Sequence, residues 1–344
     1  MHDVHLTGFG TYVPDETVTG AQIADRSGVP EDVVVEKMGV REKHVCPPDD
    51  DHASDMSVAA AEAALADADC DPADLDLVLY HGSEYKDHVV WSAAAHVAER
   101  LGADDAYAHE SYALCAGAPI AVRHTAAQLR TGDVDRALLV GASREEDLVD
   151  YDNERSSFMF NFGAGASATV LESDAVDDAA DRSRARVRES AAVTDGRFAL
   201  DVVMPAGGSE RPPTAETVAD GLHTLDVPDQ ESMKERLGEV SLPNFLTVAD
   251  DALESSGYDR SDLDFVALTH MKRSFHDYLT EELGVGPAGS HYLDEFGHVQ
   301  SADQILALDA AVEAGEGPDA GDVVLFLAAG TGYTWAATVL EWRE

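Results

Sequence analysis

One cysteine of this sequence stands where a thiol can act as a nucleophile. Cys115 lies in YALCAGAPIA, residues 112–121, between an apolar strand pattern and a helix pattern that begins with small residues. This arrangement predicts a tight strand-to-helix turn with the thiol at a helix N-terminus, where the dipole and free N–H groups favour thiolate. The other cysteines, Cys46 and Cys70, lie in a loop pattern and a polar turn. We therefore expect Cys115 to be the reactive thiol.

Two histidines in the second half of the chain are candidate partners for that thiol. His270 ends the strand pattern DFVALTH, and Lys272 and Arg273 follow it directly. His298 stands in a Gly-His turn immediately before a helix pattern. Because a cysteine nucleophile is activated by an adjacent base, a cysteine and two histidines at element ends predict nucleophilic catalysis.

An internal repeat indicates how these residues are positioned. Short segments recur in the same order in both halves, each at the same kind of predicted element. The matched pairs are 64–81 with 252–270, 135–142 with 322–329, and 168–172 with 337–341. Three matches in one order predict a duplication, with a first half over 1–175 that carries Cys115 and a second half over 176–344 that carries the histidines.

The elements within each half predict the fold class. Continuous apolar strands such as RALLVGAS alternate with alanine-rich helix patterns such as MSVAAAEAALADA. Strands that are apolar throughout are buried on both faces, as in sheets covered by helices. Two such sheets with helices between and outside them form a five-layered αβαβα sandwich. The Asp-, Pro- and Gly-rich stretch 175–243 is expected to connect the halves and to form an excursion on the substrate side.

Composition restricts the environment and the partners. The chain has 67 acidic and 23 basic residues, a formal charge of −44, spread along its whole length. Such a charge argues against binding to nucleic acid or to an anionic membrane, and it is typical of a haloarchaeal-type protein whose surface is solvated in concentrated salt. Three cysteines without CxxC spacing indicate neither a disulfide framework nor a zinc site. We expect a soluble, cytoplasmic protein that binds no metal.

Several motifs together resemble ketosynthase III, the 3-oxoacyl-acyl-carrier-protein synthase III branch of the thiolase superfamily. They are GFGTYVPDETVT, MGVREKHV, ALCAGAPIA, FNFGAGASATVL, THMKRS, FGHVQSAD and AAGTGYTWAATVLEW. The resemblance spans nearly the whole chain and implies a thiolase-like fold, a homodimer and a place in fatty acid or polyketide-type lipid metabolism. It implies acyl-CoA and malonyl-type thioesters as substrates, with no further cofactor.

The resemblance also implies roles for the candidate residues. Cys115 takes an acyl group from one thioester, and the carbanion of a second thioester, formed by decarboxylation, attacks the acyl-enzyme. His270 matches the family's catalytic histidine, whereas His298 stands where the family usually has asparagine. Both are expected to donate to the thioester oxygen, His298 supporting condensation more than acylation. Backbone N–H groups of Cys115 and Thr331 are the candidate oxyanion donors.

The residues expected to bind the coenzyme A part of the thioester differ from the family pattern. The tryptophan that stacks on adenine in the family is replaced by Val33, and an arginine on the nucleotide side is replaced by Phe275. Lys272 and Arg273 remain as a small basic cluster that suits the phosphates of one nucleotide. We therefore expect coenzyme A, rather than a carrier protein, to deliver the acyl group.

Three alternatives stay open from the sequence. Glu84, in HGSEYKD, ends the strand that the repeat pairs with the His270 strand, and a glutamate at a similar place serves the related hydroxymethylglutaryl-CoA synthases in condensation without decarboxylation. The chain could also be an acyltransferase that forms no carbon-carbon bond, or a catalytically silent partner. The presence of Cys115 together with His270 and His298 argues against a catalytically inactive partner.

Overall fold

Nine strands pair into one continuous mixed sheet in the computed structural model, which describes residues 1–343. In spatial order they are β5 (Tyr107–Glu110), β4 (Leu77–Tyr80), β6 (Arg136–Ser143), β7 (Gly165–Ser173), β1 (Val4–Tyr12), β8 (Ala185–Thr194), β11 (Thr334–Trp342), β10 (Val323–Gly330) and β9 (Leu263–Leu268). Only two residue pairs, His5 with Arg186 and Leu6 with Ala185, join β1 to β8. The sheet therefore divides naturally at that junction.

The pairing pattern repeats on the two sides of the junction. In the first half β4 is parallel to β6, and β7 lies antiparallel to both β6 and β1. In the second half β9 is parallel to β10, and β11 lies antiparallel to both β10 and β8. The segments matched in the sequence occupy matched strands: β4 with β9, β6 with β10, and β7 with β11. The predicted thiolase-like architecture of two similar halves is confirmed.

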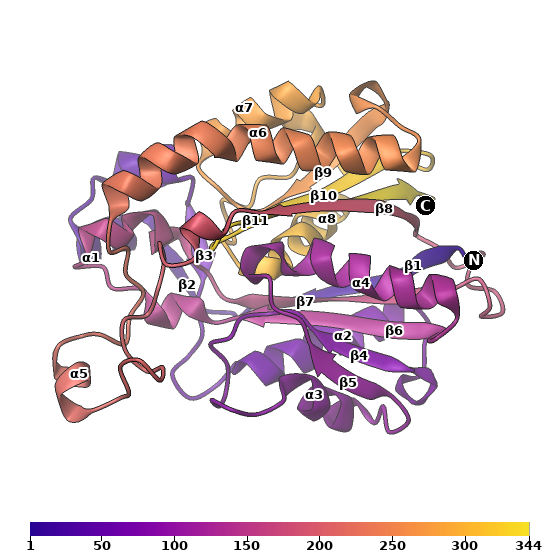
Figure 1. The fold of residues 1–344 in the computed structure, drawn as a ribbon, viewed down its shortest axis with the longest axis horizontal. Helices are drawn as coiled ribbons and strands as arrows, with labels where there is room; N and C mark the ends of the chain where they lie inside the picture. Colours follow the sequence, from indigo (N-terminus) through magenta and orange to yellow (C-terminus); the bar gives the residue numbers. More distant parts are fainter. Residues whose placement is uncertain (344) are drawn as a thin grey trace.

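Helices cover both faces of each half and fill the space between the halves (Figure 1). The helices of these layers are α2 (Ala53–Asp67), α3 (Ala93–Leu101), α4 (Gly117–Thr131), α6 (Gln230–Ser256), α7 (Arg273–Leu283) and α8 (Asp303–Ala314). Helices α4 and α8 each contact strands of both halves, whereas α2 packs on β1, β6 and β7, and α6 packs on β8, β10 and β11. The resulting order is helices, sheet, central helices, sheet and helices.

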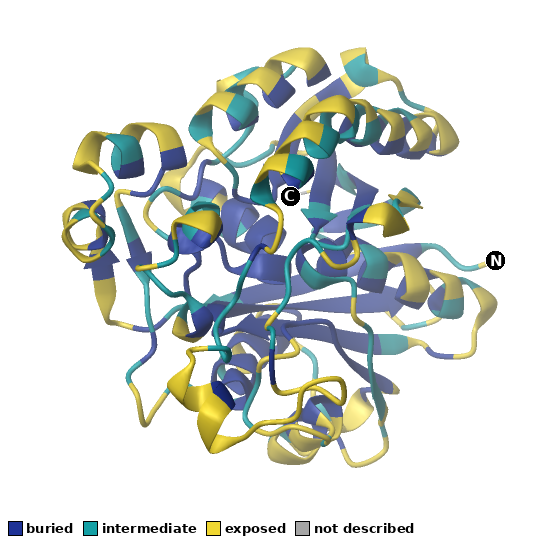
Figure 2. Ribbon diagram, turned by 60° about the vertical axis from the view of Figure 1, so that its left-hand side comes forward, coloured by how far each residue is buried: buried dark blue, intermediate teal, exposed yellow. Residues whose placement is uncertain are grey.

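Burial explains why these segments form these layers. All nine residues of β7 and seven of the eight residues of β6 are buried, as expected for strands covered on both faces. Figure 2 shows buried strands at the centre and outer helices that expose one side. One apolar cluster between the halves includes Leu6, Leu139, Ile305 and Phe326, and thus joins strands of both halves to α8.

Smaller elements lie at one end of the sandwich (Figure 1). They are β2 (Thr17–Thr19), α1 (Gly20–Ser27), a π-helical turn at Val33–Met38, β3 (Glu42–His44) and α5 (Ala215–Ala219). Helix α5 projects from the body within the segment between β8 and α6. Within residues 1–343 no helix is both long and apolar enough to cross a bilayer.

Candidate active site

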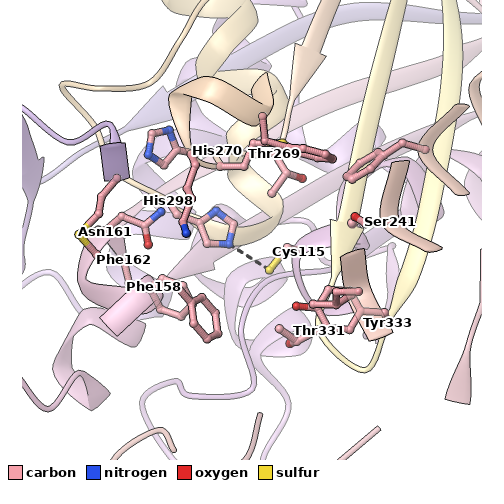
Figure 3. A pocket seen from close by; sticks show the side chains of 17 residues that line it. Cys115, Phe158, Asn161, Phe162, Ser241, Thr269, His270, His298, Thr331 and Tyr333 are labelled. Atoms are coloured by element: carbon pink, nitrogen blue, oxygen red, sulfur yellow. Dashed lines mark hydrogen bonds between the residues drawn. The ribbon is translucent and has the colours of Figure 1, made fainter. Parts of the chain in front are cut away.

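A cavity of about 240 Å³ lies where the two halves meet beside the nucleophile turn. It is lined by Met38, Cys115, Phe158, Asn161, Phe162, Leu237, Ser241, Phe245, Thr269, His270, Met271, Lys272, Phe275, His298, Ala329, Thr331 and Tyr333. Apolar side chains such as Phe158 and Phe162 line it, and Figure 3 shows the His298 ring pointing toward the Cys115 sulfur. Cys115, His270, His298 and Thr331, predicted from distant parts of the sequence, therefore border one space.

Tight backbone geometry places Cys115 at the start of the central helix α4. Cys115 sits in the short 3-10 turn Leu114–Ala116 directly before that helix and is 4% exposed. Leu114 has φ 50°, a left-handed conformation that non-glycine residues seldom adopt and that often marks functional sites. Gln300, with φ 52°, precedes Ser301 in the equivalent turn before α8. The duplication thus preserves the turn, but only the first copy carries the thiol.

The end of β10 passes close enough to Cys115 to form one wall of its site. A Cβ on Gly330 would lie 3.0 Å from the Cys115 backbone nitrogen and 2.4 Å from the Ala113 oxygen, so this approach requires glycine. Thr331 follows directly and lines the cavity. Cys115 and Thr331, whose N–H groups are the predicted oxyanion donors, therefore lie on two adjoining segments of the cavity wall.

His298 is the histidine that contacts the thiol. Its Nε2 lies 3.1 Å from Cys115 Sγ, and its Nδ1 lies 2.6 Å from Asp303 Oδ2 (Figure 3 shows the first contact). Gly297, with φ 77°, lets the chain turn into His298, because a Cβ there would lie 2.5 Å from the Asn161 oxygen. Cysteine, histidine and aspartate form a continuous hydrogen-bonded chain.

The surroundings of His298 favour its protonated form. Burial alone would lower its pKa, but the Asp303 carboxylate and the Cys115 thiol raise the pKa well above its ordinary value. Asp303 is completely buried and also accepts the backbone N–H of His270 through Oδ2, at 2.7 Å, and that of Val299 through Oδ1, at 2.7 Å. Three hydrogen bonds thus fix the position of this carboxyl group.

His270 lies in an opposite electrostatic setting. Within residues 1–343 neither ring nitrogen has a hydrogen-bond partner, and the ring packs on Tyr292 with 4.9 Å between centroids. Burial, followed by the positive charges of His298, His276 and Arg273, lowers the pKa of His270 well below its ordinary value. His270 is therefore a neutral imidazole with free polar atoms at the cavity wall, which suits donation to a substrate oxygen.

This difference changes the division of labour expected from the sequence. Both histidines were expected to act as neutral donors, and the geometry of His270 fits that role. His298 instead lies against the thiol and an anion, which is the setting of a base for Cys115. A histidine at this position can therefore exchange a proton with the thiol.

The remaining cysteines lie in settings that disfavour thiolate. Burial, together with the negative charge of Glu146, raises the pKa of the Cys46 thiol far above its ordinary value. Burial, with the charge of Glu172, raises the pKa of Cys70 to about 11. Neither thiol lines the cavity beside His298. Cys115 is thus the cysteine whose neighbours can accept its proton.

Glu84 is not brought to the cavity in a single chain. Its side chain is exposed and does not line the cavity. A different carboxyl, Glu145, is buried near His298 and accepts a hydrogen bond from Ser83 Oγ at 2.6 Å. Burial raises the pKa of Glu145, and hydrogen bonds from Ser83 and Gln300 together with the charge of His298 offset only part of this effect.

The residues expected to bind coenzyme A do not all lie at the cavity. Lys272 is exposed and lines the cavity. Arg273 instead stacks on Tyr292, at 3.9 Å from the ring centroid, and pairs with Asp294 at 3.5 Å. Val33 begins the π-helical turn whose last residue, Met38, lines the cavity. Only Lys272 of the predicted basic cluster therefore faces the cavity.

Two residues at the site were missed from the sequence. Asp303 lies five residues after His298, at the first position of α8, and a search for a carboxylate that orients the histidine could have found it. Asn161 lines the cavity, and its buried Oδ1 has no hydrogen-bond partner within residues 1–343. Its amide is a second polar group available to a substrate, and no spacing pattern indicated it.

Comparison with known proteins identifies the family of this chain. The family model for 3-oxoacyl-[acyl-carrier-protein] synthase III matches residues 110–196, and the model for the C-terminal part of that family matches residues 253–342. The chain is similar to the β-ketoacyl-[acyl-carrier-protein] synthase III of Bradyrhizobium sp. strain BTAi1, with 31% identity over 339 residues that cover 98% of each chain.

Solved structures with the same fold include a 3-oxoacyl-[acyl-carrier-protein] synthase III and OleA. The 3-oxoacyl-[acyl-carrier-protein] synthase III of Aquifex aeolicus superposes with a TM-score of 0.83 at 20% identity, over 98% of this chain and all of that one. OleA of Xanthomonas campestris, solved with lauric acid and lauroyl-CoA, superposes with a TM-score of 0.79 at 20% identity, over 99% of both chains. At these identities the likeness concerns the fold.

Proposed function

This chain belongs to the 3-oxoacyl-[acyl-carrier-protein] synthase III family of thioester-condensing acyltransferases, and from that membership we propose that it joins an acyl-CoA to a malonyl-type thioester through Cys115. The observation that carries the proposal is the 3.1 Å contact between Cys115 Sγ and His298 Nε2 at the wall of an apolar cavity. The test is to incubate the protein with acyl-CoA and malonyl-CoA and to identify a 3-oxoacyl product by mass spectrometry.

In the first step the acyl group moves to Cys115. His298 accepts the thiol proton, the thiolate attacks the thioester carbonyl carbon, and the coenzyme A sulfur leaves and takes up the proton from His298. The backbone N–H groups of Cys115 and Thr331 stabilise the negative oxygen of the tetrahedral intermediate. The apolar walls from Phe158, Phe162 and Phe245 keep water from the acyl-enzyme.

In the second step a malonyl-type thioester supplies the carbanion. Its carbon-carboxylate bond breaks, carbon dioxide leaves, and negative charge develops on the thioester oxygen. Neutral His270, whose ring nitrogens are free, donates a hydrogen bond to that oxygen. The enolate carbon attacks the acyl carbonyl, the new carbon-carbon bond forms, and Cys115 leaves as thiolate. The proposed steps use only groups of this chain and the two thioesters.

Coenzyme A is the proposed acyl carrier. The OleA structure with lauroyl-CoA shows that a protein of this fold can hold such a thioester. In this chain an exposed lysine, Lys272, faces the cavity, and the chain carries 67 acidic against 23 basic residues. A single cation suits a nucleotide phosphate, whereas an acidic carrier protein meets general repulsion.

Lys272→Glu is expected to raise KM for acyl-CoA about three- to tenfold, with a smaller change in kcat, because it replaces an attractive charge near the phosphates by a repulsive one. Steady-state kinetics at fixed molar salt measure the effect. Arg211→Glu is the matched charge reversal, since Arg211 is exposed and lies outside the cavity lining. Equal KM values for both variants would contradict the assignment of Lys272.

A homodimer that works in concentrated salt is the proposed assembly. Strand β5 is an edge of the sheet. Exposed apolar side chains lie on or near it, namely Tyr107, Tyr112, Val89 and Val90, which are 49%, 40%, 89% and 103% exposed. An unpaired strand edge beside apolar side chains is a surface to which a second subunit can bind.

The net charge of −44 makes the acidic side chains repel one another unless salt screens them, which supports a halophilic setting.

Light scattering across a potassium chloride series is expected to give a dimer mass in molar salt and dissociation or unfolding as salt is removed. The physical reason is that the Debye length rises from about 3 Å at 1 M to about 10 Å at 0.1 M, so repulsion between like-charged subunits grows. Tyr107→Asp, at the edge strand, is expected to weaken the dimer in molar salt. A monomer at micromolar concentration in molar salt would count against this assembly.

A further inference from the structure

The Asp303 carboxylate is the group that most directly controls the charge of His298. It is completely buried, it contacts His298 Nδ1 at 2.6 Å, and His298 Nε2 contacts Cys115 Sγ at 3.1 Å. We propose that Asp303 is a positioning residue that makes His298 the base for Cys115, so that the resting enzyme holds a thiolate-imidazolium pair. This inference rests on the proposed function of Cys115 as the nucleophile.

The proton balance of this arrangement is simple. The proton leaves Cys115 Sγ and binds His298 Nε2, while Nδ1–H continues to donate to Asp303 Oδ2. No net charge enters the site, because the thiolate and the imidazolium form together. When coenzyme A leaves, the same proton moves from Nε2 to the departing sulfur. Asp303 never contacts substrate and acts only through the imidazole.

The same carboxylate also links the site to the second histidine. Asp303 Oδ2 accepts the backbone N–H of His270 at 2.7 Å, and Oδ1 accepts the backbone N–H of Val299 at 2.7 Å. One side chain at the start of α8 thereby fixes the end of β9 and the turn that carries His298. Because a buried carboxylate with three donors cannot rotate without losing bonds, the tautomer and orientation of His298 are set.

Other charged groups around His298 must be separated from Asp303 in a test. Cys115 faces it from the turn before α4, His270 from the end of β9, and Glu145 from the segment after β6. Glu145 acts on His298 only through space, and burial raises its pKa. Phe162 covers one side of the imidazole, with 5.1 Å between centroids. Asp303 is thus the one carboxylate in hydrogen-bond contact with His298 among the described residues.

The test is the pH dependence of Cys115 alkylation by iodoacetamide, which needs no acyl substrate. In Asp303→Asn the imidazolium loses its anion, so the thiolate forms only at higher pH. We expect the midpoint of alkylation to rise by about one unit or more, and the rate below the wild-type midpoint to fall about tenfold. An unchanged midpoint overturns the inference.

Three controls distinguish this role from a structural one. Gln304→Ala removes a buried hydrogen bond to Thr269 from the neighbouring position of α8 and is expected to leave the midpoint unchanged. Glu145→Gln is expected to shift it less than Asp303→Asn. In a His298→Asn background, Asp303→Asn is expected to have no further effect, because the carboxylate acts through the imidazole. A full shift in that background overturns the inference.

Two further outcomes keep the test decisive. If Asp303→Asn does not fold, proton NMR of the wild type still decides the question. A strongly downfield imidazole N–H resonance that vanishes in His298→Asn supports the pair, and its absence at all pH values contradicts it. If Cys115→Ser is alkylated like the wild type, the proposed nucleophile itself is wrong, which separates failure of the function from failure of the inference.

Discussion

Cys115→Ser is expected to abolish the acyl adduct and to lower condensation by about 10⁴-fold or more, the largest effect of any single substitution in this chain. The serine hydroxyl fits the same turn but stays protonated, because its pKa lies far above that of a thiol. The buried His298 imidazole cannot remove that proton as readily. Intact-protein mass spectrometry after incubation with a panel of acyl-CoAs in molar salt measures the adduct directly.

Cys70→Ser is the matched control for this experiment. Cys70 is half-buried, and burial raises its pKa to about 11, so it contributes little thiolate at neutral pH. The control is expected to keep the wild-type adduct mass and stoichiometry. An adduct that persists in Cys115→Ser and disappears in Cys70→Ser would show that a different thiol carries the acyl group.

His270→Ala is expected to lower condensation by about 10²- to 10³-fold while acylation of Cys115 stays within a few-fold of the wild type. His270 is neutral and its ring nitrogens are free, so it is arranged to stabilise developing charge on the extender oxygen. Among residues 1–343 its ring nitrogens form no hydrogen bond, to the Cys115 thiol or to any other group, whereas His298 contacts that thiol. Single-turnover kinetics separate the two steps, with acyl-enzyme formation followed first and decay by malonyl-CoA second.

His298→Ala is the control, because it is expected to impair acylation more than the decarboxylation step, the reverse of His270→Ala. His298 contacts Sγ, so its removal is expected to slow acylation more than it slows the later decarboxylation. Equal loss of both steps in both variants would contradict this division of labour. The reverse pattern would restore the expectation from the sequence, in which His298 supports condensation.

Much of the fold could be predicted from the sequence because burial leaves a local signature. Strands β6 and β7 are apolar at nearly every position, since both faces are covered, and α2 is rich in alanine because it packs closely on the sheet. The repeat between β4 and β9 was visible because equivalent strands face equivalent surroundings. The apolar strands, the alanine-rich helix and the repeat are all patterns among residues close together in sequence, so they can be read from one sequence.

The residues that would bind coenzyme A could be predicted only in part. Lys272 and Arg273 are adjacent in sequence and looked equivalent, yet Lys272 faces the cavity while Arg273 stacks on Tyr292 and pairs with Asp294. Adjacent residues at a helix start point in different directions, so each meets different partners. The sequence shows the charges, whereas the partners of each charge come from elements far along the chain.

The position of the Glu84 side chain likewise could not be predicted from the sequence. The repeat correctly paired the strand before Glu84 with the strand before His270, but β4 ends at Tyr80, so Glu84 lies four residues beyond the strand and not at its end. The side chain nevertheless lies at the surface in a single chain, and Glu145, which no motif indicated, is the carboxyl buried near His298. Strand equivalence fixes where a backbone ends, but it does not fix the direction of a side chain in the following loop.

The sequence by itself determined the two similar halves, the nucleophile turn at Cys115 and the arrival of both histidines at the same site. Only the tertiary structure decided that His298 rather than His270 contacts the thiol, and that Asp303 stands behind it. The physical reason is that these roles depend on side-chain orientation and burial across 183 residues of sequence. Burial lowers the pKa of His270, whereas the Asp303 carboxylate raises that of His298, so the two histidines differ in protonation. Neither burial nor this contact leaves a periodic pattern in the sequence.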